Sequence, residues 1–289
     1  MKRSIRYVLS EHESACLAKA CADERLHAAN SEDQQAVVNA CQAIVQSVEH
    51  EASGLVAVIR SLRELRTSPG LVVLEGLPTV EDSRRLIILL GSVLGNLLKY
   101  PNEGDYVIAI KEKQTKPGER PSFQNAREFY FHTDLSYTEN PPRYLMMHAV
   151  VNKPGEGGIS LFADIDRVAK NLSPLDINEL QKPQFLFPAP PHYKGGGTVK
   201  LPILTQDELS GVWRLRFRRD NLRAETRPGV DAVVQLVRAI NECAEEVMLV
   251  SGSMVMLDNQ SFLHGRTAFA GSGEATHEPR HLNRAYASC

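Results

Sequence analysis

Hydrophobic residues recur at helical spacing in the first part of the chain. The repeat of Val37, Cys41, Ile44 and Val48 places one apolar residue in each turn. This spacing is typical of an amphipathic helix that buries one face. We therefore expect residues 1–68 to form a helical N-terminal part.

From residue 69 onward, short apolar runs alternate with turn residues. One amphipathic segment, at about 230–248, interrupts them and is expected to be an inserted helix. The runs that predict strands are LVVLEGL (71–77), DYVIAIK (105–111), YLMMHAVV (144–151), GISLFAD (158–164), PQFLFPA (183–189), VWRLRFRR (212–219) and SMVMLDN (253–259). Many short strands separated by turns favour a sandwich or a barrel. We expect one α+β domain over residues 1–289, in which the helical part packs against an all-β core at 69–289.

Composition narrows the possible functions. Hydrophobic residues make up 43% of the chain and charged residues 24%, which is ordinary for a soluble globular protein. A net charge of −2 offers no global attraction to nucleic acid or to a membrane surface. The apolar run at 86–98 is too short to cross a bilayer, and the N-terminus has no signal-peptide pattern. Five cysteines without a CxxC pair indicate neither a disulfide framework nor a zinc finger.

These features predict a cytoplasmic protein without a nucleic-acid or membrane partner. The N-terminal helices either provide a homodimer surface or only brace the core. The sequence does not distinguish between these two roles.

The stretch FHTDLSY at 131–137 places two metal-competent side chains, His132 and Asp134, one residue apart. On a strand, side chains at i and i+2 point to the same face. Burying both polar groups without partners costs several kcal/mol. A solvated edge or a mutual hydrogen bond satisfies them, and so does a shared metal ion.

A second histidine, His264, lies just beyond the apolar strand expected at 254–257. From there it can reach into the mouth of a barrel, or it can face water in a turn. Two imidazoles and one carboxylate suit ferrous iron with several coordination positions left open. Zinc is also possible on ligand type alone.

Two arginines, Arg280 and Arg284, stand four residues apart near the C-terminus. They share a face on a helix or on a strand. Arginine binds carboxylates in a bidentate manner and keeps its charge near neutral pH. The pair can therefore anchor two acids beside a metal, or it can simply lie on the surface.

Taken together, these motifs resemble the clavaminate synthase and taurine dioxygenase superfamily. The resemblance rests on HTD at 132–134, GGISLFAD at 157–164, DNQSFLHGR at 258–266 and RHLNR at 280–284. Members are Fe(II)- and 2-oxoglutarate-dependent oxygenases built on a double-stranded β-helix, or jelly roll. The resemblance covers the chain from about residue 70 to its C-terminus.

The resemblance implies a role for each matching residue. His132, Asp134 and His264 would ligate iron. Arg280 would bind the distal carboxylate of 2-oxoglutarate, together with Ser160, which stands where the family often has threonine. Arg284 would contact the acidic group of the substrate.

The implied reaction uses Fe(II), 2-oxoglutarate and O2 to hydroxylate, or otherwise oxidise, a small amino acid or an amino-acid-derived metabolite, as in antibiotic biosynthesis. Members that halogenate have a small residue at the position of Asp134, so a carboxylate there favours oxygen transfer. The alternatives are oxidation of a sulfonate or another small organic acid, and a jelly-roll protein that binds metal without oxidation, including a zinc hydrolase.

Two weaker features lie near these motifs. The run at 212–219 alternates arginines with apolar residues, and its arginines are expected on the solvated face of an outer strand. Asp220 follows it and is a candidate to bind the amine of a substrate. The polar loop at 112–128 is either a lid or an ordinary surface loop.

Overall fold

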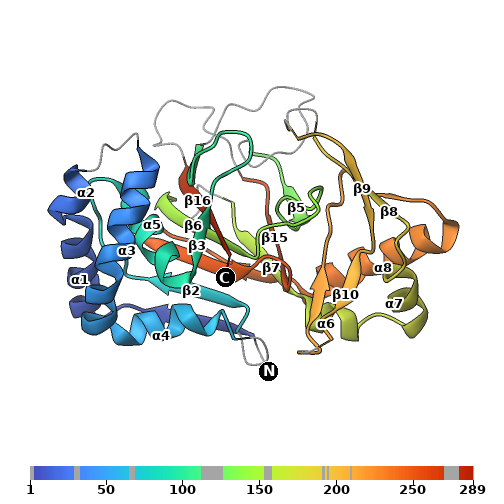
Figure 1. Cartoon of the computed structure of the whole chain (residues 1–289). Helices are drawn as coiled ribbons and strands as arrows, with labels where there is room; N and C mark the ends of the chain where they lie inside the picture. Colours follow the sequence, from blue (N-terminus) through green and yellow to red (C-terminus); the bar gives the residue numbers. More distant parts are fainter. Residues whose placement is uncertain are drawn as a thin grey trace.

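The chain is a mixed α/β protein whose strands form several sheets (Figure 1). The computed structural model describes residues 3–28, 33–64, 69–111, 126–152, 158–190, 193, 195–208, 210–269 and 280–288. Its helices are α1 (Glu11–Cys21), α2 (Glu24–Ala28), α3 (Gln34–Glu51), α4 (Ser53–Ser61), α5 (Ser83–Leu94), α6 (Ile165–Lys170), α7 (Pro174–Leu180) and α8 (Arg227–Cys243). Its strands are β1 (Ser4–Val8), β2 (Leu71–Glu75), β3 (Asn96–Leu98), β4 (Val107–Lys111), β5 (Phe129–His132), β6 (Tyr144–Val151), β7 (Ser160–Asp164), β8 (Phe185–Pro188), β9 (Thr198–Leu201), β10 (Leu204–Gln206), β11 (Trp213–Leu215), β12 (Arg223–Ala224), β13 (Glu245–Val247), β14 (Ser253–Asp258), β15 (Phe262–Arg266) and β16 (His281–Ser288).

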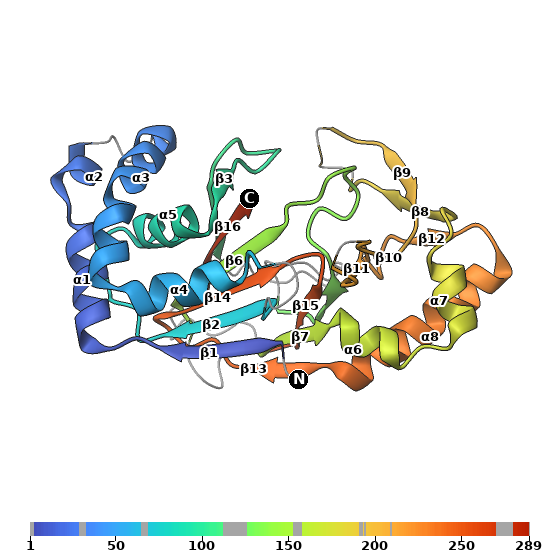
Figure 2. The same cartoon turned by 60° about the horizontal axis from the view of Figure 1, so that its bottom comes forward.

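Two sheets carry the architecture. A seven-stranded sheet has the order β1-β2-β14-β6-β16-β3, with β4 also paired to β16. A four-stranded sheet has the order β13-β7-β15-β5. Figure 2 shows β1, β2 and β14 side by side although they come from distant parts of the chain. Smaller sheets, β12-β8-β9 and β10-β11, lie beside α7 and α8 in the same view.

The large sheet is apolar on both faces because alternate residues of each strand enter different cores. On β2, Val72 and Leu74 belong to the core beneath the N-terminal helices, whereas Leu71 and Val73 belong to a second core. On β16 the second core receives Leu282 and Tyr286. Successive side chains of a strand point to opposite faces, so the nearly continuous apolar runs read from the sequence correspond to strands covered on both sides.

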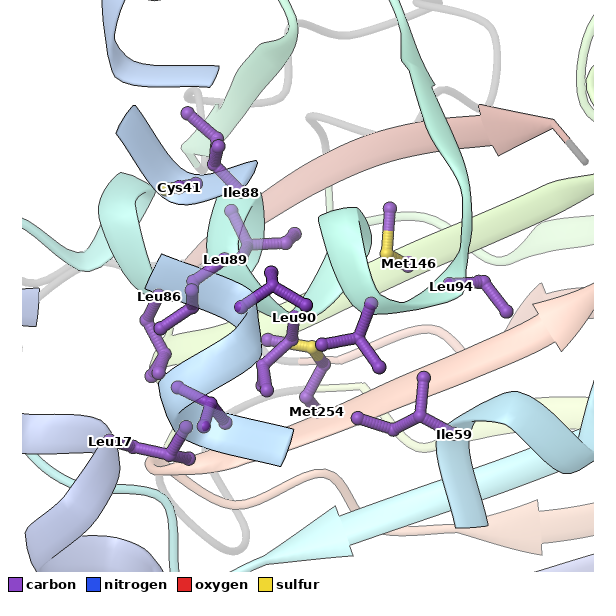
Figure 3. Packing of buried hydrophobic residues seen from close by; sticks show 14 of the residues in the cluster. Leu17, Cys41, Ile59, Leu86, Ile88, Leu89, Leu90, Leu94, Met146 and Met254 are labelled. Carbon is purple, nitrogen blue, oxygen red and sulfur yellow. The ribbon is translucent and has the colours of Figure 1, made fainter. Parts of the chain in front are cut away.

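The N-terminal helices gather on one side of the central strands, while α6 to α8 lie at the other side (Figure 1). Helix α5 is buried almost all round and lies in the first core with Met146 and Met254 of the sheet (Figure 3). A side chain at Gly91 would meet Met146 at 2.9 Å, so glycine permits this close approach of α5 to β6. The apolar run at 86–98 is thus mainly a core helix. None of the helices in the described ranges is long and apolar enough to cross a bilayer.

The structure corrects the expectation that residues 1–68 are helical throughout. The chain begins with a strand, β1, which pairs in parallel with β2 through partners such as Ser4 with Leu71. The helix expected at 230–248 begins earlier, at Arg227, and ends at Cys243. The residues that follow form β13, which pairs with β7. Both strands are stabilised by partners remote in sequence, which a local periodicity does not reveal. Of the expected loop at 112–128, residues 112–125 lie outside the described part.

The second core lies between the inner face of the large sheet and the four-stranded sheet. It includes Val255 and Leu257 from the large sheet, Phe162 and Leu263 from the small one, and Leu236 from α8. The polar groups described next lie on these two sheets and on the turn that follows β5.

Candidate metal centre

The pairing of two neighbouring strands brings His132 and His264 together. His264 on β15 is the direct cross-strand partner of His132 at the end of β5. Their ring centroids are 4.2 Å apart. Directly paired residues project to the same face of an antiparallel sheet, so both imidazoles point inward.

Asp134 completes the cluster from a different position than the sequence predicted. Strand β5 ends at His132, and Asp134 lies in the turn that follows instead of on the strand. Its Oδ1 nevertheless lies 3.2 Å from Nε2 of His132 and 3.8 Å from Nε2 of His264. All three side chains are buried, and one potential ligand atom from each lies within 4.8 Å of the others.

The hydrogen bonding of His132 indicates which nitrogen faces the cluster. Its Nδ1 lies 2.8 Å from the carbonyl oxygen of Tyr130. A carbonyl can only accept, so Nδ1 donates and Nε2 is the nitrogen that faces Asp134. The 3.2 Å approach of Nε2 to Oδ1 of Asp134 needs a proton or another cation between the two atoms. This geometry suits a metal ion.

The protonation states also suit a metal. Burial, and then the proximity of His132, lower the pKa of His264 to about 3, so this imidazole is neutral near pH 7. Burial alone would raise the pKa of Asp134, but attraction to Arg284 and contact with His132 hold it well below its usual range. Neutral imidazoles and an ionised carboxylate are the forms that bind divalent metals.

The backbone of Asp134 is held by Asn259, for which the sequence analysis gave no individual role. The Asn259 side chain accepts from the Asp134 amide at 2.9 Å and donates to the Asp134 carbonyl at 3.1 Å. It also donates to the carbonyl of Pro142 at 2.9 Å. The only sequence signal for this role was the DN dipeptide before His264.

The other oxygen of Asp134, Oδ2, has its own partners. The Tyr286 hydroxyl donates to it at 2.9 Å, and Nη1 of Arg284 lies 3.4 Å away. The Arg284 guanidinium lies 5.2 Å from the ring of Tyr100 and 5.5 Å from that of Tyr286. Arg284 therefore neutralises the carboxylate of the cluster in this structure.

One cavity joins the triad to most of the other residues singled out from the sequence. Ser160, Arg280 and Arg284 line it together with His132, Asp134 and His264. Its remaining wall includes apolar side chains, and the lining residues of this kind are Ile110, Phe129, Met147 and Leu282.

Ser160 on β7 is the cross-strand partner of Arg266 on β15, and both residues line the cavity. Arg266 is buried, lines the cavity and donates to the carbonyl of Arg127. The sequence signal for Arg266 was the HGR motif at 264–266, in which only His264 was assigned a role of its own.

Asp220 is not among the residues that line this cavity. It forms a bidentate ion pair with Arg218, at 2.8 and 3.2 Å. Although burial raises the pKa of Asp220, this pair lowers it overall. In the structure, the Asp220 carboxylate is thus paired with the Arg218 guanidinium.

The arginines at 212–219 do not form the expected solvated stripe. Strand β11 ends at Leu215, but the alternation continues, because Phe217 is also buried. The arginines at 214, 216 and 218 are half-buried instead of solvated. Arg216 turns back and donates to the carbonyls of Ser136, Thr138 and Glu139. It thereby fastens the turn that carries Asp134.

Comparisons with known proteins agree with this geometry. Residues 49–286 match the model of the family described as taurine catabolism dioxygenase TauD, TfdA family. A curated relative, 3-((Z)-2-isocyanoethenyl)-1H-indole synthase of Fischerella ambigua (strain UTEX 1903), is 26% identical over 175 residues. That alignment covers 54% of this chain and 62% of the relative, which is less than two thirds of the relative's length.

Two solved structures are similar over nearly the whole chain. Asparagine oxygenase in complex with Fe(II), 2S,3S-3-hydroxyasparagine and succinate has a TM-score of 0.84 at 20% identity, covering 98% of this chain and 93% of that one. The non-heme iron oxygenase OrfP, in complex with Fe, succinate and (3R,4R)-dihydroxy-L-Arg, has a TM-score of 0.78 at 17% identity, covering 98% and 94%. These likenesses establish a shared fold.

Proposed function

Because this chain belongs to the TauD/TfdA family of dioxygenases, we propose that it is an Fe(II)- and 2-oxoglutarate-dependent dioxygenase of a small amino acid or amino-acid-derived metabolite. The observation that carries the proposal is the convergence of His132, Asp134 and His264 in one cavity with Arg280 and Ser160. The cofactor is Fe(II), and the cosubstrates are 2-oxoglutarate and O2.

Iron would be held by Nε2 of His132, Oδ1 of Asp134 and Nε2 of His264. The three donors come from two paired strands and one fastened turn, so the chain sets their positions before any metal binds. When bound, iron and 2-oxoglutarate supply the chemistry that couples decarboxylation to succinate and CO2 with oxidation of the substrate by O2. Because Asp134 fills the third ligand position, we expect oxygen transfer and not halogenation.

The cosubstrate site would be formed by Arg280 and Ser160. A guanidinium binds the distal carboxylate of 2-oxoglutarate through charge-assisted hydrogen bonds, and the serine hydroxyl adds one more donor. The apolar wall residues Met147 and Leu282 limit access of water to this side of the cavity, which strengthens the electrostatic contacts inside.

The substrate would carry an acidic group that Arg284 binds. Similar proteins support an amino-acid-derived substrate, because asparagine oxygenase was solved with hydroxyasparagine and OrfP with a dihydroxyarginine. The curated relative is a synthase of an isocyanoethenyl indole, which is also a small nitrogen-containing molecule. Asp220 would contact the substrate's amine only after exchanging its partner Arg218.

We further propose that the two facing sheets form a double-stranded β-helix, or jelly roll, and that the chain is a single oxygenase domain. The likeness to the two oxygenase structures over 98% of the chain supports both statements. The other expectations from sequence are kept as proposals: a cytoplasmic location, no nucleic-acid or membrane partner, and a homodimer formed through the N-terminal helices.

An anaerobic titration tests the proposed cofactors. The protein with Fe(II) and 2-oxoglutarate together should give a weak visible charge-transfer band, which neither component alone produces. His264→Ala should remove the band, whereas Arg167→Ala should keep it, because this exposed arginine pairs with Glu245 and does not line the cavity. A wild-type protein that gives no band would refute the proposal and favour a metal protein without oxidative chemistry.

A second experiment identifies the substrate class. Free amino acids, their N-modified derivatives and, as a separate panel, taurine and other sulfonates are screened for substrate-dependent formation of succinate. The proposal expects activity in the amino-acid panels. Activity confined to sulfonates would replace the proposed substrate class but keep the cofactors.

A further inference from the structure

The two oxygens of Asp134 face different surroundings. Oδ1 faces the two imidazoles, at 3.2 and 3.8 Å. Oδ2 points away from them and accepts a hydrogen bond from the Tyr286 hydroxyl at 2.9 Å. The structure therefore separates the oxygen available to a metal from the oxygen bound by the protein.

The position of Tyr286 makes this hydrogen bond a specific feature of the site. Tyr286 lies on β16 opposite Leu145 of β6 and Leu98 of β3, and only 3% of the residue is exposed. Its ring stacks on that of Tyr100, with centroids 5.9 Å apart. Phenylalanine would fill the same apolar space without a hydroxyl. A buried hydroxyl costs free energy unless it is hydrogen-bonded. The hydroxyl is satisfied by Asp134.

A fixed Oδ2 matters because of how many ligands an octahedral metal accepts. Two imidazoles and one carboxylate oxygen leave three of six positions open. A 2-oxoacid chelate takes two of these and O2 needs the third. A carboxylate bound through both oxygens would remove one of them, so the site needs a group that keeps Oδ2 away from the metal.

We propose that Tyr286 is a positioning residue that holds Oδ2 of Asp134, so that the carboxylate offers the metal Oδ1 alone. The inference rests on the proposed iron site. Arg284 also contacts Oδ2, but at 3.4 Å and with a proposed second partner in the substrate. The tyrosine hydroxyl holds Asp134 whether or not Arg284 is engaged elsewhere.

The test compares Tyr286→Phe with the matched control Tyr144→Phe. Tyr144 is also fully buried, lies on the neighbouring strand β6 and donates to the backbone carbonyl of Leu62, on the side of the sheet that faces the helices. Metal-free protein is titrated with Co(II), whose visible absorption reports affinity and coordination number. We expect Tyr286→Phe to weaken Co(II) binding roughly 10- to 100-fold, because the carboxylate loses the partner that orients it. The bands should also weaken toward those of a higher coordination number, because Oδ2 is then free to reach the metal. Tyr144→Phe should match wild type in both.

A rescue and a double mutant separate positioning from a general packing role. With 4-aminophenylalanine at position 286, a donor returns at nearly the same place, and affinity should return close to that of wild type. In an Asp134→Ala background, Tyr286→Phe should have no further effect on Co(II) affinity. If Tyr286→Phe folds poorly, 4-fluorophenylalanine at position 286 replaces it, because it keeps a substituent of similar size at that place but donates no hydrogen bond, and the same loss of affinity is expected.

The outcomes distinguish this inference from the proposed function. If the wild-type protein binds Co(II) but Tyr286→Phe has the same affinity and spectrum, the positioning role is wrong and the iron site stands. An equal effect of Tyr286→Phe in the Asp134→Ala background would also overturn it. If wild type binds no Co(II), the proposed iron site fails, and the inference fails with it.

Discussion

Replacing Asn259 with alanine tests how the turn that carries Asp134 is held. Asn259 is 0% exposed, and its side chain makes three hydrogen bonds to backbone groups of Asp134 and Pro142. Alanine removes all of them at once. The Asp134 amide and both carbonyls then lie in a buried region without the partners they had.

The size of the effect follows from these contacts. A protein hydrogen bond contributes about 1 kcal/mol net, and leaving buried backbone groups unsatisfied costs more. Three bonds therefore predict a loss of about 3–4 kcal/mol in the free energy of unfolding. A chain of 289 residues has an unfolding entropy of about 0.6 kcal/mol/K near its midpoint. The melting temperature should fall by about 5–7 °C.

The assay is calorimetric unfolding of metal-free protein, with Asn283→Ala as the matched control. Asn283 is 1% exposed and lies in the large sheet, where its side chain donates a hydrogen bond to the Ser83 hydroxyl at 2.9 Å. Its loss should cost about 1 kcal/mol, which lowers the midpoint by roughly 2 °C. Asn259→Ala should also weaken Co(II) binding, whereas Asn283→Ala should not. The reasoning is refuted if Asn259→Ala melts within 1 °C of its control, a margin of about 0.6 kcal/mol.

Three further changes test other parts of the site and the core. Arg280→Ala should raise the 2-oxoglutarate concentration needed for half-saturation by about 30-fold or more, because truncating one partner of a charged pair costs at least about 2 kcal/mol. An unchanged half-saturating concentration in steady-state assays would show that Arg280 does not bind the cosubstrate. Burial, and then His281, lower the pKa of His148 to about 4. As the pH falls, the unfolded chain therefore protonates this histidine before the folded protein does. Urea unfolding of metal-free protein should show the free energy of unfolding decreasing from about pH 6.5 toward pH 4. His148→Gln should reduce that slope without abolishing it, because the lowered pKa of His264 acts over the same pH range. An unaltered slope would contradict the assignment. Asp220→Asn should raise the KM of a free amino acid but not of its N-acetyl derivative, and equal effects on both would limit Asp220 to its pair with Arg218.

The strands of the large sheet were predicted well where their sequence is strongly apolar. The run at 144–151 has the bounds of β6, and the run at 253–259 ends one residue after β14. Strand β1 was missed because its stability comes from pairing with β2, more than sixty residues away in sequence. A local pattern contains no information about such a partner.

The candidate site shows the same division between local and long-range information. The spacing of His132 and Asp134 left a shared metal as one alternative, and the resemblance carried by four separate motifs assigned it together with His264. The structure places the three side chains together. The groups that hold Asp134 were not predicted, because Asn259 and Tyr286 are 125 and 152 residues away in sequence. Only the folded structure brings Asn259 and Tyr286 next to Asp134, in the turn that follows β5.

The charges around Asp134 suggest an order for binding. Without a metal, a buried carboxylate needs compensation, and here Arg284 and the Tyr286 hydroxyl provide it. The carboxylate ligand is thus also held by groups of the chain itself, unlike the ligands of domains that fold only with metal. On the proposed function, a divalent ion held at Oδ1 would weaken the attraction of Arg284 to Asp134, and the guanidinium would then be available to the acidic group of a substrate. On the proposed function, metal binding should therefore precede and strengthen substrate binding, and by linkage the substrate should strengthen metal binding by the same factor.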